Sequence, residues 1–202
     1  MKCPKCKMEY VAEFPEDAKV HRGYHDKIVN GIYAPRIKSD EVVWEKDDYR
    51  ITVVNYFSPR TQKIRAGKAA VVANKDTPFD FAPYYSREPL DDRNVHIFLL
   101  YIKSRIIGFL IVERRDTVWS FTWKEYEKAV RKNTLQVEPL WSIGLAWIHH
   151  KHRRRGLGAQ LVQTAASHFD LETHSSGWYT PFTDDGEKLA KSLCHKSFFC
   201  AK

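Results

Sequence analysis

The sequence predicts an α+β fold in which a small metal-stabilised module at the N-terminus precedes a larger domain of strands and helices. Cysteine and histidine residues gather in residues 1–32, whereas residues 33–136 alternate between strand-like runs and polar segments. Residues 137–202 then follow the order strand, basic glycine-containing turn, helix, strand, helix, strand. We therefore expect two domains, 1–32 and 33–202.

The composition suits a packed, basic protein. Of its 202 residues, 43% are hydrophobic and 13% aromatic, which argues against a largely disordered chain. The formal net charge of +8 favours polyanionic partners, including nucleic acid, without choosing among them. The start Met1-Lys2-Cys3-Pro4 does not have the pattern of a secretory signal, and the apolar runs are too short to cross a bilayer. We expect an intracellular protein with no membrane partner, nuclear in a eukaryote and cytoplasmic in a bacterium.

The first segment has the spacing of a zinc site. Two cysteines separated by two residues can present both sulfurs from one turn, and two histidines four residues apart share one face of a helix. Pro15 at the start and Gly31 at the end delimit that helix. We expect a ββα-type Cys2His2 zinc finger with structural Zn2+, because four protein ligands leave no open position. Its ligands are Cys3, Cys6, His21 and His25, and its small core is Tyr10, Phe14, Val20 and Ile28.

The finger has two interpretations. A single finger contacts only about three base pairs and binds weakly by itself. Docking against the neighbouring domain or a protein partner is therefore favoured, with contact to nucleic acid or a chromatin-associated partner left open.

The middle segment contains the next strands. Runs rich in β-branched and apolar residues predict strands at Ile51–Phe57, Lys68–Ala73, His96–Ile102 and Ile106–Glu113, the last two as a hairpin. The long stretch Asn74–Asn94 is expected to be a loop, and its aromatic residues suit either a functional lid or a plug at the core's edge. A surface helix is expected at Trp123–Lys132.

The stretch Leu140–Phe169 predicts a phosphate-binding turn. An apolar strand leads into a basic turn with Gly156 and Gly158, and an amphipathic helix follows. Glycines allow a close approach of the backbone, and free N–H groups at a helix N-terminus bind phosphate. Arg153, Arg154 and Arg155 add positive charge there. A basic solvated helix start or a nucleic-acid patch is the alternative.

The pattern Arg153-x-x-Gly156-x-Gly158 resembles the coenzyme A signature of the GNAT acetyltransferases. Together with the finger, the chain resembles the cohesion-establishment N-acetyltransferases, which couple one such finger to a GNAT domain. The likeness is strongest in residues 3–30, 96–113 and 142–159 and in the terminal segment Trp178–Cys194. It implies a three-layer GNAT fold with a central mixed, mostly antiparallel sheet. It also implies transfer of acetyl from acetyl-CoA to lysines of a cohesin subunit.

The resemblance also implies the cofactor-binding residues. The pantetheine arm would lie along the backbone of Ala146, Trp147 and Ile148. The basic turn and helix start would hold the pyrophosphate through Arg153, Arg154, Arg155, Gly156, Leu157, Gly158 and Ala159. Thr183, Asp184 and Asp185 would lie near the distal end of the cofactor.

Two departures from the family concern the acceptor half. The family's catalytic serine falls here on Gly144, and its catalytic aspartate falls on Pro181, neither of which can accept a proton. The family's long helix between the early strands also looks replaced by the loop Asn74–Asn94. We therefore expect a retained cofactor half and a rebuilt acceptor half, to which the cohesin substrate does not transfer directly.

Other side chains must then move protons, and the catalytic candidates are Ser142, Tyr179 and Thr180. Ser142 sits two residues before Gly144 on the same face of its strand, and a tyrosine suits protonation of the leaving thiolate. Glu138, Asp184 and Asp185 are the nearest carboxylates in sequence. Each has a structural alternative: packing for Ser142, an interface aromatic for Tyr179 and a helix cap for Asp184. Cys194 and Cys200 are expected to be buried thiols.

The sequence favours an acetyl-CoA-dependent N-acetyltransferase acting on a primary amine, with a protein lysine as the preferred acceptor. A small-molecule amine acetyltransferase is the second interpretation. The third is a non-catalytic zinc-finger module that binds nucleic acid or protein and retains a coenzyme-binding scaffold.

Overall fold

The computed structural model describes residues 1–77, 92–130 and 139–201. The strands are β1 (Ile32–Tyr33), β2 (Glu41–Lys46), β3 (Tyr49–Val54), β4 (Val95–Ile102), β5 (Arg105–Arg115), β6 (Val118–Thr122), β7 (Leu140–Ile148), β8 (Gly177–Tyr179) and β9 (Ser197–Ala201). The helices are α1 (Pro15–Asn30), α2 (Arg60–Lys75), α3 (Trp123–Glu127), α4 (Leu157–His168) and α5 (Asp184–Leu193), with short 3-10 turns at His150–His152 and Thr173–Ser175.

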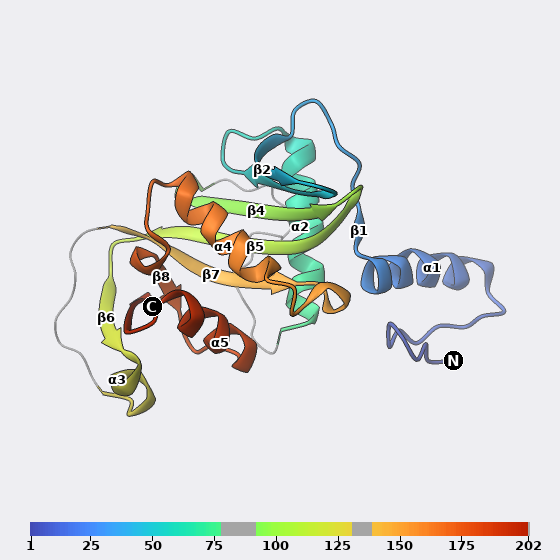
Figure 1. Ribbon diagram of the computed structural model, residues 1–202. Helices are drawn as coiled ribbons and strands as arrows, with labels where there is room; N and C mark the ends of the chain where they lie inside the picture. Colours follow the sequence, from blue (N-terminus) through green and yellow to red (C-terminus); the bar gives the residue numbers. More distant parts are fainter. Residues whose placement is uncertain (78–91, 131–138, 202) are drawn as a thin grey trace.

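The strands form one mixed sheet in the order β2-β3-β4-β5-β7-β8-β9-β6, and β1 pairs with β5. Neighbours from β2 to β7 are antiparallel, as are β9 and β6, whereas β7–β8 and β8–β9 are parallel. Helix α2 covers one face of the sheet, and α4 and α5 cover the other (Figure 1). The three layers and the mixed, mostly antiparallel sheet confirm the predicted fold class.

Each face of the sheet has its own core. Alanines of α2 pack against β4, β5 and Trp147 on one side. Leu161, Val162 and Ala165 of α4 pack against β3, β4 and β5 on the other. Burying apolar surface on both sides of the central strands explains why the runs His96–Ile102 and Ile106–Glu113 are apolar almost throughout. Both are confirmed as the hairpin β4–β5.

The strand predicted at Lys68–Ala73 is wrong, because these residues belong to α2. Ala66, Ala69, Ala70 and Ala73 recur at helical spacing and are all buried. Alanine is the best helix former, and a short apolar run does not by itself distinguish a strand from a helix. The long helix between the early strands is therefore present, and the expectation that a loop replaces it is wrong. The aromatic residues of the predicted Asn74–Asn94 loop lie outside the described residues.

Helix α3 is shorter than the predicted Trp123–Lys132. It begins with a capping box between Thr122 and Glu125 and extends to Glu127, followed by Lys128 as its C-cap. The C-terminal order of strand, turn, helix, strand, helix and strand is confirmed by β7, α4, β8, α5 and β9. Among the described residues, no helix is long and apolar enough to cross a membrane.

The finger helix α1 begins at Pro15 and ends before Gly31, as predicted, and Gly31 has a positive φ of 83°. The predicted miniature core is wrong: Phe14 is 65% and Val20 59% exposed. Tyr10 instead stacks on His21, and Ile28 packs against the core of the larger domain. After α1 the chain passes directly into β1, whose Ile32 pairs with Ile106 of β5.

Candidate functional site

The four predicted zinc ligands come together at the start of the chain. The sulfur and imidazole nitrogen atoms of Cys3, Cys6, His21 and His25 all lie within 4.8 Å of one another. Cys3 Sγ is 3.3 Å from His25 Nδ1. The pKa of the Cys3 thiol is lowered to about 5, chiefly by the backbone N–H of Cys6. His21 Nε2 is buried and has no hydrogen-bond partner among the described residues. This donor set fits a structural Zn2+, since a thiolate and an orphaned imidazole nitrogen both gain a partner when it binds.

A cavity of about 880 Å³ lies where β7, the N-terminal end of α4 and the start of α5 meet. The structure places around it every predicted cofactor residue except Arg155, which is exposed. Sequence reasoning missed several further lining residues: Asp76, Thr77, His152, Phe182, Gly186, Lys188, Leu189 and Ser192. Asp76 and Thr77 follow α2, His152 belongs to the basic turn itself, Phe182 precedes α5, and the other four lie in α5. Pattern reasoning did not place the end of α2 beside the basic turn.

The basic turn opens onto α4 in a way that suits phosphate. Gly156 occupies the N-cap with a φ of 74°, a conformation that favours glycine. Gly158 and Ala159 in the first turn of α4 line the cavity, so the free N–H groups of the helix start lie at its wall. Arg154 forms an ion pair with Asp185 of α5 at 2.7 Å, which joins the two sides of the cavity mouth.

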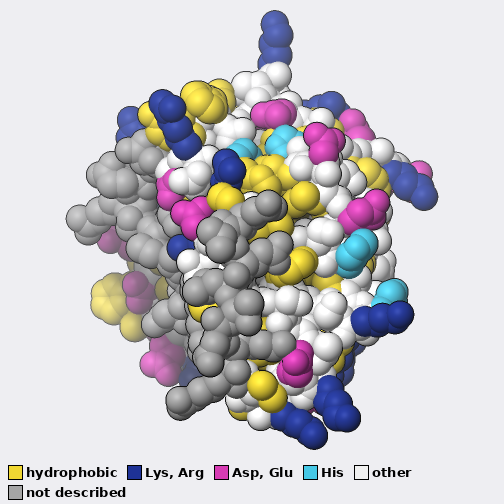
Figure 2. Space-filling model, turned by 90° about the vertical axis from the view of Figure 1, so that its left-hand side faces the viewer, with side chains coloured by type: hydrophobic (Ala, Val, Ile, Leu, Met, Phe, Trp, Pro, Cys, Tyr) yellow, Lys and Arg dark blue, Asp and Glu magenta, His cyan; other side chains and the backbone are white. Residues whose placement is uncertain are grey.

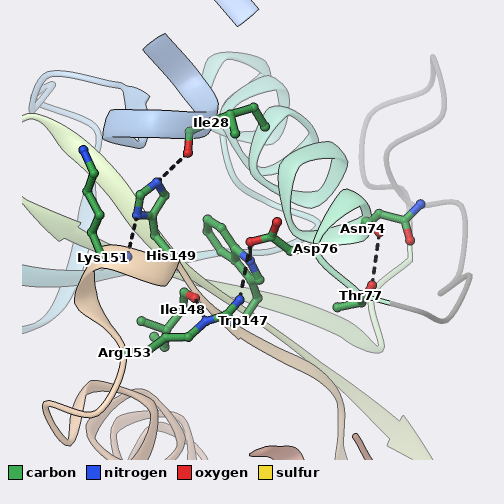
Figure 3. Close-up of polar contacts among 9 residues, drawn as sticks. All are labelled: Ile28, Asn74, Asp76, Thr77, Trp147, Ile148, His149, Lys151 and Arg153. Carbon is green, nitrogen blue, oxygen red and sulfur yellow. Dashed lines mark hydrogen bonds and ion pairs between the residues drawn. The ribbon is translucent and has the colours of Figure 1, made fainter. Parts of the chain in front are cut away.

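Arg153 is held by the protein itself. Its Nε donates to the carbonyl of Ile148 at 2.8 Å, and its guanidinium lies 3.4 Å from Asp76 Oδ2. The same Asp76 oxygen accepts a hydrogen bond from the indole of Trp147 at 2.9 Å. Figure 3 shows Asp76, at the end of α2, beside Trp147 of β7 and Arg153 of the turn that follows the strand. Arg153 therefore fastens the turn to α2.

His149 holds the other side of the same turn. Its Nε2 lies 2.9 Å from the carbonyl oxygen of Ile28 in α1, and its Nδ1 accepts from the backbone N–H of Lys151 (Figure 3). Burial lowers the pKa of His149 to about 4. The finger helix thus contacts the turn that leads from β7 to the first cavity's lining residues on α4.

A second cavity of about 400 Å³ adjoins the first. The two share Ala146, Phe182, Thr183, Gly186 and Leu189 in their linings. Strands β7 and β8 pair at Ser142↔Gly177 and Ile143↔Trp178, and the residues that follow on each strand line the cavity. Both Gly144 and Pro181 are among the lining residues. The positions where side chains of the resembled family would act therefore face this second cavity.

The polar end of the second cavity is formed by Glu113, Arg115 and Tyr179. Glu113 is only 6% exposed. The Tyr179 hydroxyl donates to Glu113 Oε2 at 2.8 Å, and Arg115 forms an ion pair with the same oxygen at 2.5 Å. Arg115 Nε also donates to the Tyr179 hydroxyl. Sequence reasoning found Tyr179 but missed Glu113, although a carboxylate at the end of an otherwise apolar strand is a signal.

The remaining catalytic candidates differ in their positions relative to the two cavities. Ser142 is fully buried, donates to the carbonyl of Leu140 and lies against Gly177, so it is not in the lining of either cavity. Thr180 does line the second cavity, but its hydroxyl lies 3.3 Å from the buried thiol of Cys200. Glu138 lies outside the described residues. Asp184 and Asp185 lie in the first turn of α5 and line the first cavity.

Comparison with known proteins agrees with this geometry. Residues 68–178 match the family described as "Acetyltransferase (GNAT) family". The chain therefore belongs to the GNAT family of acetyltransferases. Residues 1–27 match the family described as "zinc-finger of acetyl-transferase ESCO", so the protein combines an ESCO-type zinc finger with a GNAT domain.

The curated relatives are named as N-acetyltransferases of the ESCO and ECO1 type. The chain is 24% identical over 213 residues to human "N-acetyltransferase ESCO1", covering 95% of this chain and 24% of that protein. It is 24% identical over 230 residues to "N-acetyltransferase ECO1" of Candida glabrata, covering 98% of this chain and 86% of that protein. The chain thus spans about a quarter of the human relative and most of the yeast one.

Among solved structures, the fold resembles that described as "Structure of xEco2 acetyltransferase domain bound to K105-CoA conjugate". The TM-score is 0.65 at 19% identity, covering 82% of this chain and 98% of the other. A GNAT acetyltransferase takes its acetyl group from acetyl-CoA, and the first cavity has the helix N-terminus and basic turn that a pyrophosphate requires.

Proposed function

We propose that the protein transfers an acetyl group from acetyl-CoA to a primary amine, with a lysine side chain of another protein as the preferred acceptor. The observation that carries this proposal is the junction of the two cavities at Ala146, Thr183 and Leu189. A thioester seated in the first cavity could extend its acetyl end to this junction, where an amine entering the second cavity would meet it. Holding both reactants in this way is itself a large part of acyl-transfer catalysis.

The second cavity favours a lysine-like acceptor. Most of its wall is apolar, with Ile111, Leu145, Trp178 and Phe182 among its residues, and its polar end carries the buried Glu113 carboxylate. An aliphatic stem suits the wall, and an ammonium group suits the carboxylate. The predicted Asp184 and Asp185 belong to the first cavity and have no place in this acceptor site.

The resembled family adds a specific acceptor to this proposal. Lysines of a chromosomal cohesin subunit are the substrates that the resemblance implies, in an intracellular setting. The ESCO-type finger and the relatives named ESCO1 and ECO1 support testing them first. Contact with nucleic acid has less support: on the face shown in Figure 2, Lys and Arg side chains are interspersed with Asp and Glu.

Two alternatives have weaker support. A small-molecule acetyltransferase is motivated by a rebuilt Asn74–Asn94 loop, most of which lies outside the described residues, but the early helix that this loop was expected to replace is present as α2. A non-catalytic scaffold was motivated by Gly144 and Pro181, but Glu113 and Tyr179 supply ionisable groups in the same cavity.

Release of free coenzyme A thiol from acetyl-CoA tests the proposal. The purified protein should release thiol with lysine-containing peptides, and peptides with arginine at the acceptor position should be inert. Polyamines and aminoglycosides serve as the small-molecule arm. Millimolar acetyl-CoA should also raise the melting temperature. Absence of both stabilisation and thiol release with every amine would refute the proposed activity.

A further inference from the structure

The arrangement of Glu113, Arg115 and Tyr179 needs an explanation beyond stability. Glu113 and Arg115 lie on one face near the end of β5, and Tyr179 ends β8 on the far side of β7. Burying a carboxylate is costly even when it is paired, and an apolar replacement of a buried ion pair is often as stable. Such a cluster facing a cavity beside a cofactor site is typical of groups that move protons.

We propose that Glu113 is the general base of the acetyl transfer and that Tyr179 is its partner acid, an inference that rests on the proposed function. Glu113 takes a proton from the acceptor ammonium. The free amine nitrogen then attacks the acetyl carbonyl carbon, the new C–N bond forms and the C–S bond breaks. The amine nitrogen gives up its second proton to solvent, and the leaving coenzyme A thiolate takes the Tyr179 hydroxyl proton.

The 2.8 Å hydrogen bond between the two side chains completes the proton balance. After Tyr179 has given its proton to the thiolate, it takes back the one that Glu113 received. The net result is one proton moved from the acceptor to coenzyme A thiol and one released to solvent, with both side chains restored. Arg115 contacts both groups, so we infer that it is a positioning residue that offsets the carboxylate charge and orients the phenol.

The positions of the other candidate side chains exclude them as the general base. Among the described residues that line the second cavity, Glu113 is the sole carboxylate. Ser142 lies outside the lining, and the Thr180 hydroxyl is directed to Cys200. Gly144 and Pro181 offer no titratable atom. The base has thus moved to a different strand from the one on which the resembled family places its serine.

The test compares Glu113→Gln, Glu113→Asp and Tyr179→Phe with wild type in the thiol-release assay at several pH values. Glu113→Gln keeps the size of the side chain but removes the base, and we expect kcat to fall about 100-fold or more. The acid limb of the pH profile of kcat/KM should disappear as well, because it reports deprotonation of the base. Glu113→Asp should restore part of the rate. Tyr179→Phe should lower kcat most at high pH, where external acids are scarce.

Folding is checked separately. Glu113 and Tyr179 do not line the first cavity, so all three variants should keep the wild-type melting shift with acetyl-CoA. The matched control is Asp116→Asn, an exposed carboxylate just after β5, which should retain wild-type kcat and pH profile.

The outcomes separate the two proposals. If wild type releases thiol and Glu113→Gln stays within about twofold of it, or loses rate without a change in pH profile, the assignment of Glu113 is wrong while the proposed function stands. If wild type releases no thiol with any amine, the proposed function fails and this inference fails with it.

Discussion

His149 donates a hydrogen bond from Nε2 to the carbonyl oxygen of Ile28, linking the turn after β7 to the finger helix α1 at 2.9 Å. Because Nδ1 accepts from the backbone N–H of Lys151, the neutral imidazole with its proton on Nε2 satisfies both bonds. Protonation of Nδ1 would break the second bond. Beside it, Arg105 pairs with Asp26 at 2.8 Å and also donates to the carbonyl of Gly31. The end of α1 is thus fixed to both β5 and the cofactor turn.

This relationship predicts a dependence of stability on pH. Burial lowers the folded-state pKa of His149 from 6.5 to about 4, and the neighbouring His150 and His152 also lower it, whereas the Ile28 carbonyl and Asp76 oppose the shift. Well above pH 6.5 both folded and unfolded states hold the neutral ring, so its contribution is constant. As the pH falls from 6.5 towards 4, the unfolded state takes up the proton first, and the free energy of unfolding decreases.

We therefore expect His149→Gln to flatten the fall in melting temperature between pH 7 and pH 5, because glutamine can still donate to Ile28 and does not titrate. The exposed His174→Gln is the matched control and should keep the wild-type slope. Protonation of the zinc ligands contributes equally to the slope in all three proteins, so it cancels when each variant is compared with wild type. Equal slopes for wild type and His149→Gln would contradict the assignment.

Asp76 is expected to control acetyl-CoA affinity through the turn that it anchors. Asp76→Ala removes the acceptor of Trp147 Nε1 and the ion pair with Arg153. Hydrogen bonds to charged groups contribute about 1.5–3 kcal/mol, so we expect the Kd for acetyl-CoA, measured by calorimetry, to rise roughly tenfold or more. The control Asp48→Asn removes an exposed ion pair with Lys103 and should leave Kd unchanged. A tighter Kd in Asp76→Ala would mean that repulsion between the carboxylate and the phosphates outweighs its anchoring role.

Zinc is expected to hold the finger together in place of an apolar core. Helix α1 has no fully buried residue, and Phe14 and Val20 are exposed. We expect about one zinc per chain and a selective loss of residues 1–25 to limited proteolysis after chelation or in Cys6→Ala. The GNAT domain should survive as a resistant fragment, because its cores do not include the ligands. Cys194→Ala is the control and should retain the metal. Full zinc content in Cys6→Ala would contradict the site.

Features set by residues close together in the chain could be predicted from the sequence, whereas features that join residues far apart in the chain could not. The zinc ligands and the glycines of the basic turn lie close together in the chain, so spacing alone fixes their geometry. Helix α2 was predicted in part as a strand because Lys68–Ala73 is a short apolar run, and only packing against the sheet reveals its alanine face. Asp76 lies 71 residues from Trp147, and Glu113 lies 66 residues from Tyr179, so their roles depend on the order of strands in the sheet.

Gly177 is expected to be required by the packing of β8 on β7. A Cβ atom at this position would lie 2.1 Å from Ser142 Oγ and 2.9 Å from Ser142 Cβ, both closer than real contacts permit. Ser142 is fully buried, and rotation of its side chain moves Oγ but not Cβ, so a change of rotamer cannot relieve the second contact. We expect Gly177→Ala to lower the free energy of unfolding by about 1–3 kcal/mol, the usual cost of overpacking a core.

Two comparisons make the packing prediction specific. Adding Ser142→Gly removes both contacting atoms and should recover part of the lost stability of Gly177→Ala, giving a coupling energy of about 1 kcal/mol or more in a double-mutant cycle. Gly23→Ala in α1 meets no atom within 4 Å and should be neutral or stabilising by up to about 1 kcal/mol, since alanine favours helix. Chemical denaturation gives the free energies of unfolding of wild type and of the four variants. Strict additivity of Ser142→Gly and Gly177→Ala would show that the destabilisation arises from something other than this contact. Ser142 and Gly177 are paired in register, so the space between them affects how β8, which ends in Tyr179, packs alongside β7.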